Sequence, residues 1–87
     1  MPEISRFLGI IIKMFFDDHN PPHFHVEYGE FKAIIDIRTA ELLEGYLPSK
    51  QLKLVQAWAI LHEEELLENF ENLGKDVKSW IKIEPLK

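Results

Sequence analysis

The sequence predicts a small α+β domain, in which an antiparallel meander of about four strands over residues 7–44 packs against one long C-terminal helix over residues 50–73. Apolar side chains alternate along the first region between turn-forming residues, as in half-buried strands. In the second region they recur at intervals of three or four, which is the spacing of one helix face. The length of 87 residues fits a single domain, expected here to span residues 1–87.

The first strand is expected over residues 7–16, and it is apolar on both faces. One face carries Ile10, Ile12, Met14 and Phe16, and the other carries Ile11 and Phe15. A strand of this kind is usually central or covered on both sides. Asp17–Pro22 then breaks the pattern, because proline fixes φ and biases its predecessor away from the helix. Further strands are expected at His23–Tyr28, Phe31–Ile37 and Glu41–Glu44.

The helix is expected to be capped by Ser49 and to end at Gly74. An extended tail follows over residues 75–87, as an additional edge strand or as a segment lying across the sheet. The double-sided first strand and two leucines opposite the main helix stripe leave apolar surface that one helix cannot cover. This predicts an interface with a small protein partner or a second copy, whereas the alternative is that the tail covers this surface. The interface candidates are Leu54, Leu61, Trp80 and Ile81.

Composition excludes several classes of protein. The chain has no cysteine, which rules out disulfides, thiolate metal sites and a cysteine nucleophile. The apolar run Phe7–Ile12 is too short for a membrane span or a secretory core, so a cytoplasmic protein is expected. The net charge of −5, with the acidic excess in residues 1–73, disfavours direct nucleic-acid binding. Only the tail, with Lys75, Lys78, Lys82 and Lys87, is mildly basic.

Histidines and carboxylates concentrate around the proline pair Pro21-Pro22. His23, His25 and Glu27 alternate along one predicted strand, so they project from the same face with Cα atoms about 6.5–7 Å apart. Two imidazole nitrogens at this spacing can converge on one ion at roughly 2.0–2.1 Å each. The Pro-Pro corner holds the preceding residues in a fixed relation to this strand, and a metal or catalytic site needs such rigidity.

Three interpretations of this cluster stay open. It can hold a divalent transition metal, since nitrogen and oxygen ligands without sulfur suit Zn²⁺, Fe²⁺, Mn²⁺ or Ni²⁺. It can work as a metal-free acid–base site, or it can be a structural hydrogen-bonding cluster. The candidate metal ligands are Asp17, His19, His23, His25 and His62. The candidate catalytic residues are Asp18, His19, His23, His25 and Glu27, and Asp18 and Glu27 are also considered as completing a metal shell.

His62 lies on the apolar stripe of the predicted helix. A histidine in this position is usually a core residue bonded to a carbonyl or a carboxylate, and the stripe favours this interpretation. The alternative is that it packs onto the sheet and completes the site of His23 and His25.

The chain also resembles a family of small bacterial proteins, the domain of unknown function (DUF) 4160 family. The resemblance rests on Gly9–Ile12, Asp18–His25, Tyr28, Gly45, Leu47-Pro48, Trp58, His62, Glu65-Leu66 and Ile83–Leu86. It implies a protein with no assigned activity, often encoded beside a second small protein of another uncharacterised family (DUF 2442), in a layout similar to toxin–antitoxin modules. No catalytic residues can be carried over, and the one transferable motif is His23-Phe24-His25. The lysine-rich segment 75–82 departs from the family.

Three functional hypotheses follow. The first is a protein-interaction module, one half of a toxin–antitoxin-like or regulatory pair. The second is a metal-dependent hydrolase or nuclease that uses His23 and His25. The third is that the histidines are purely structural.

Overall fold

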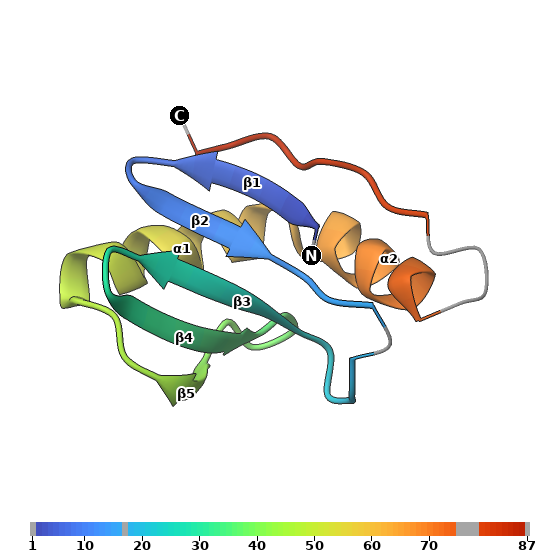
Figure 1. Ribbon diagram of the computed structural model, residues 1–87, viewed down its shortest axis with the longest axis horizontal. Coiled ribbons are helices and arrows are strands. Elements are labelled where there is room, and N and C mark those ends of the chain that lie inside the picture. The colour runs from blue at the N-terminus through green and yellow to red at the C-terminus, as the bar shows by residue number, and fades with distance from the viewer. Residues whose placement is uncertain (1, 17, 75–78, 87) are drawn as a thin grey trace.

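Five antiparallel strands and two helices build the described part of the chain, which is residues 2–16, 18–74 and 79–86 of the computed structural model. The strands are β1 (Glu3–Phe7), β2 (Ile10–Lys13), β3 (His23–Tyr28), β4 (Phe31–Asp36) and β5 (Leu42–Gly45), and they lie in the sheet in sequence order. The helices are α1 (Ser49–Leu61) and α2 (Glu63–Leu73). Both helices lie behind one face of the sheet (Figure 1), and no helix covers the opposite face of this described sheet. The prediction of an α+β fold built on an antiparallel meander is confirmed.

The predicted first strand is wrong, because residues 7–16 contain a turn. Phe7 pairs directly with Ile10, so Leu8 and Gly9 form a two-residue hairpin loop between β1 and β2. Both loop residues have positive φ, 50° and 79°, as the tight hairpin turn that matches strand twist requires. Phe16, which was expected to continue the strand face of Ile10 and Ile12, lies after the end of β2 with its side chain exposed.

The single long helix is a second correction, because the chain leaves helical geometry at His62. This residue has φ −118° and ψ 25°, and its N–H is directed at the carbonyls of Trp58 and Ala59. The break is short enough that the buried faces of both helices still meet the sheet. Those faces consist of Val55, Trp58 and Ala59 on α1 and Leu66, Asn69 and Leu73 on α2. Gly74 ends α2 as predicted, whereas Ser49 is the first helical residue and Pro48 takes the cap position.

The core centres on Trp58, whose side chain is fully buried between α1 and the sheet. Its ring meets Phe24 of β3 edge-on at 5.8 Å and Phe7 of β1 at 5.5 Å between ring centroids. Its indole N–H donates to the carbonyl of Glu84 in the tail at 2.8 Å. A buried indole usually finds such a partner, so the core also fixes the tail.

The tail over residues 79–86 has no regular structure and runs beside β1 (Figure 1). The backbone N–H of Ile83 donates to the carbonyl of Ile4 at 2.9 Å. The fully buried Asn69 of α2 holds Ile81 at both backbone groups, with its amide donating to the carbonyl at 2.7 Å and its oxygen accepting from the N–H at 3.0 Å. The tail therefore closes the seam between the helices and β1. Of the four predicted basic residues, Lys82 is exposed, and Lys75, Lys78 and Lys87 lie outside the described residues.

Candidate metal centre

Three side chains meet where β3 begins. His25 projects from the uncovered face of the sheet, opposite Phe24 and Val26, whereas His23 at the start of β3 is buried and packs on α2. The corner before β3 contains a cis Asn20–Pro21 bond, and it brings Asp18 back to the two imidazoles. This corner is tied to the sheet because the N–H of Ile37 donates to the carbonyl of Pro22 at 3.0 Å.

One oxygen of Asp18 contacts both rings. Its Oδ2 lies 2.9 Å from Nε2 of His23 and 3.0 Å from Nε2 of His25. The donor atoms of these three residues all lie within 4.8 Å of one another, close enough to share one ion. Among the described residues, this trio alone forms a group with metal-binding spacing.

The hydrogen bond on the far side of His23 determines which ring nitrogen faces Asp18. Nδ1 lies 2.7 Å from the carbonyl oxygen of Pro21. A carbonyl only accepts, so Nδ1 carries a proton, and Nε2 is the ring atom that faces Asp18, either with a proton between the two atoms or with its lone pair. A lone pair facing a carboxylate oxygen is unfavourable unless a proton or a metal cation lies between them. Metal-bound histidines show the same arrangement, with the second ring nitrogen donating to a backbone carbonyl.

The surroundings keep Asp18 ionised. Its side chain is only 20% exposed. Partial burial acts to raise the pKa of Asp18, but the hydrogen bond from His25, the charge of His23 and the N–H of His19 outweigh it and hold that pKa below its ordinary value. The cluster thus presents an anionic oxygen beside two nitrogens, which is the donor chemistry of a transition-metal site.

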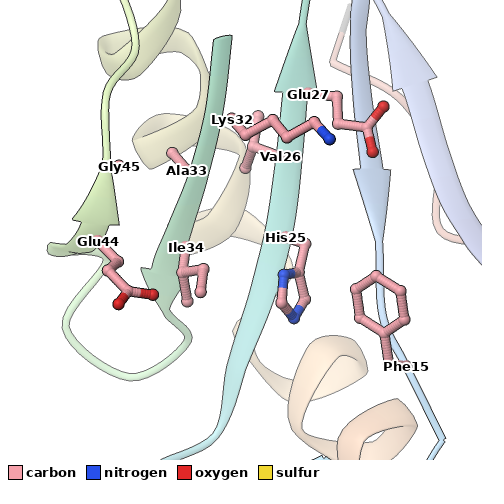
Figure 2. A pocket seen from close by; sticks show the side chains of 9 residues that line it. All are labelled: Phe15, His25, Val26, Glu27, Lys32, Ala33, Ile34, Glu44 and Gly45. Atoms are coloured by element: carbon pink, nitrogen blue, oxygen red, sulfur yellow. The ribbon is translucent and has the colours of Figure 1, made fainter.

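Aromatic rings flank both histidines. Phe15 meets His25 edge-on at 4.3 Å, and Phe70 of α2 lies 5.7 Å from His23 between ring centroids. Phe15 and His25 stand side by side at one end of a hollow of about 540 Å³ on the uncovered sheet face, next to Ile34 (Figure 2). His25 thus lies both in the cluster and in the wall of this hollow, which apolar and charged side chains line together.

Several predicted site residues lie apart from this trio. His19 is exposed and contributes only its backbone N–H, which donates to Oδ1 of Asp18 at 3.1 Å. Glu27 pairs with Lys13 of β2 at 2.9 Å. His62 places Nδ1 2.7 Å from Oε1 of Glu65 and packs on Trp58. The structure therefore places the side chains of His19, Glu27 and His62 apart from the cluster of Asp18, His23 and His25.

The acidic member of the trio is Asp18, whereas Asp17 lies outside the described residues. Sequence reasoning missed two neighbours of the site, Phe70 and Arg38. Phe70 carried a signal, because it lies on the helix stripe that faces the sheet. Arg38 carried none, because only the turn after β4 brings it near the proline corner.

The predicted interface residues divide into two pairs. Leu54 and Trp80 are partly buried against the core. Leu61 and Ile81 are exposed, and Ile60 beside Leu61 is exposed as well. Within the described residues, no helix combines the length and apolarity that crossing a bilayer requires.

The fold and the trio define a small α+β protein with a two-histidine, one-carboxylate cluster at the end of an antiparallel sheet. A family model described as a domain of unknown function, DUF4160, matches residues 9–71, and the chain belongs to this family. The match includes all three residues of the cluster. Comparison with curated proteins and with solved structures gives no match.

Proposed function

We propose that the protein binds a divalent transition-metal ion through Oδ2 of Asp18 and Nε2 of His23 and His25. The observation that carries the proposal is the single carboxylate oxygen facing two imidazole nitrogens at 2.9 and 3.0 Å, one of which belongs to a ring already fixed by Pro21. For ligands about 2.0–2.1 Å from a metal, neighbouring donors in an octahedral site are about 2.9 Å apart. The two nitrogen–oxygen distances thus suit two ligand edges of such a site.

The number of ligands indicates the type of metal centre. Structural zinc sites are closed by four protein ligands, whereas catalytic sites use three and leave a position for water or substrate. Two histidines and one carboxylate form the ligand set of hydrolytic zinc sites and of mononuclear iron sites. In such a site the ion acidifies bound water and polarises a substrate oxygen. We therefore propose an open centre that binds a further ligand, and metal-dependent hydrolysis is the chemistry it supports.

Metal titration by calorimetry tests this proposal. Wild-type protein stripped with chelator is expected to bind one equivalent of Zn²⁺ or Mn²⁺. Loss of a residue that merely orients a ligand costs about 10–100-fold in affinity, so His23→Ala and Asp18→Ala are expected to cost at least about 100-fold. His19→Ala is the matched control, because this histidine is adjacent in sequence and exposed. Equal affinity of the wild type and a His23→Ala/His25→Ala double variant would contradict the proposal and leave a structural role for the histidines.

A second candidate function is a protein-interaction module within a regulatory pair. It is favoured by two adjacent apolar side chains at the end of α1, since Ile60 is 67% and Leu61 70% exposed. Adjacent exposed apolar side chains of this kind are typical of contact surfaces. Co-expression with the neighbouring gene product, followed by light scattering, is expected to give a complex that Leu61→Lys weakens. A monomer that retains no partner under these conditions would count against this function.

A further inference from the structure

A groove lies beside the metal centre on its other side. It has a volume of about 440 Å³ and runs between the proline corner, the turn after β4 and the end of α2. Asp18 lines it from the metal side, Leu67 and Phe70 supply apolar surface, and Arg38 lies in its wall. Its volume lies within the range of about 300–1,000 Å³ that is typical of small-molecule sites, and its lining combines these two apolar side chains with several polar and charged residues.

Arg38 lines this groove, and its guanidinium forms no ion pair with any of the described residues. Asp18 and Glu71 line the same groove, yet neither forms an ion pair with Arg38, and no other residue in the described part of the chain does. A cation that shares a groove with carboxylates but stays unpaired has its donors available to a ligand. The five donors of a guanidinium form a planar fork that matches a carboxylate or a phosphate group.

The turn that carries Arg38 is rigid and joined to the metal site. Oδ1 of Asp36 accepts hydrogen bonds from the N–H groups of Arg38 at 2.8 Å and Thr39 at 2.9 Å. The adjacent Ile37 donates to the carbonyl of Pro22, in the corner that positions Asp18. The backbone of Arg38 and the carboxylate of Asp18 therefore keep a fixed separation, which a ligand can bridge without moving either element.

We infer that this groove binds a small organic oxyanion, whose phosphate or carboxylate group bridges the metal ion and Arg38 while its apolar part lies on Leu67 and Phe70. The inference rests on the proposed metal centre. A bound divalent ion outweighs the charge of Asp18, so both ends of the groove attract an anion. The net charge of −5 and Glu71 at the groove oppose a polyanion such as nucleic acid, which needs many neutralising cations. The ligand class is therefore a small molecule with one anionic group.

The test uses the full chain loaded with Co²⁺, whose visible spectrum reports ligands entering the metal shell. Metal content is measured first. Phenyl phosphate and benzoate are then titrated separately, which distinguishes a phosphate from a carboxylate site. Inorganic phosphate has no apolar part, so its affinity shows how much the aromatic ring contributes to binding. At least one aromatic probe is expected to change the spectrum and to bind more tightly than inorganic phosphate. Arg38→Ala and Arg38→Gln are expected to weaken its binding at least tenfold with metal affinity unchanged.

The matched control is Arg6→Ala, which removes the other arginine of the chain, an exposed residue of β1 paired with Glu3. It is expected to bind metal and probe as the wild type does. If metal is bound but neither aromatic probe binds, or if Arg38→Ala binds like the wild type, the inference is overturned and the proposed metal centre stands. If the wild type takes up no metal, the proposed function and this inference fall together.

Discussion

Asp18 is the residue on which the cluster depends, because a single oxygen of its side chain contacts both histidines. Burial and hydrogen bonding act in opposite directions on it, and the hydrogen bond from His25 together with the charge of His23 leaves its pKa below the ordinary value. The folded state thus favours the ionised form. The ionised carboxylate can bind a cation. Because its pKa differs between the folded and unfolded states, the free energy of unfolding also depends on pH through Asp18.

The metal-free protein is therefore expected to lose stability in acid through Asp18. A carboxyl whose pKa is lower in the folded state contributes fully above its unfolded pKa of about 3.9, and this contribution disappears as the pH falls through the folded pKa. The difference in free energy of unfolding between the wild type and Asp18→Asn should be constant at pH 5–6 and shrink below about pH 4. Urea denaturation in the presence of chelator measures it. Glu30→Gln, in the exposed turn after β3, controls for a general charge effect, and the same pH dependence there would contradict the argument.

The sequence placed the two histidines of the site together, but it named Asp18 only as one of several candidates for the third member. His23 and His25 could be placed together because a strand alternates its faces with a period of two, whatever the rest of the fold does. Which of Asp17, Asp18 and His19 turns back to them depends on the path of the chain through the proline corner. Local pattern carries no information on that path.

At the level of elements, the pairing of β4 with β5 depends on one glycine. Gly45 closes β5 with φ 86°, and a Cβ there would lie 2.2 Å from the carbonyl oxygen of Lys32 on β4. Gly29, in the turn between β3 and β4, also has positive φ, at 57°, but a Cβ there would meet nothing within 4 Å. The two positions separate the effect of backbone conformation from the effect of close packing.

Gly45→Ala is accordingly expected to be much more destabilising than Gly29→Ala. The left-handed conformation costs a side chain about 1–2 kcal/mol, and this is the whole expected cost at Gly29. At Gly45 an overpacking cost of about 1–3 kcal/mol adds to it, because backbone atoms of a neighbouring strand must shift. Chemical denaturation of the two variants measures the difference. Equal costs at both positions would show that β5 moves away freely.

The two errors in the predicted elements have related causes. The apolar run of residues 7–16 contains a hairpin that the sequence pattern does not predict, because a leucine rarely adopts the positive φ that Leu8 has. The apolar spacing of the helix continues through His62, so a break of one residue leaves no trace in it. β3, in contrast, has its predicted bounds, because prolines precede it and a glycine turn follows it.

At the level of the whole molecule, the contacts that close the fold join residues far apart in the sequence. Trp58 donates to Glu84, Asn69 holds Ile81, and Ile4 accepts from Ile83. The sequence left the path of the tail open because each of these bonds pairs a helix or strand with irregular backbone. In Asn69 alone a signal was present, as a polar residue on a stripe that is otherwise apolar.

Asp18, His23 and His25, the ligands of the proposed metal centre, join the proline corner to the sheet, so a bound metal ion is expected to stabilise the whole fold. A ligand at 100 times its dissociation constant adds about 2.7 kcal/mol to a protein that binds it only when folded. For a domain of this size, that corresponds to a rise of about 10–20 °C in Tm. Calorimetry with Zn²⁺ and with chelator measures the shift. The His23→Ala/His25→Ala variant should show none, and a similar shift in both proteins would indicate binding elsewhere.

The tail bonded along β1 has one more consequence, for the two borders of the sheet. Ile83 occupies a backbone acceptor of β1 that would otherwise face water, whereas all four residues of β5 are exposed and no described segment lies beyond them. An unpaired edge strand can form backbone hydrogen bonds with a strand of another chain, which is a common start of aggregation. In this protein, β5 is the edge strand at which such pairing is expected to begin. Its shortness, the irregular pairing at Ile34/Ile35 and the charge of Glu44 are the features that oppose it.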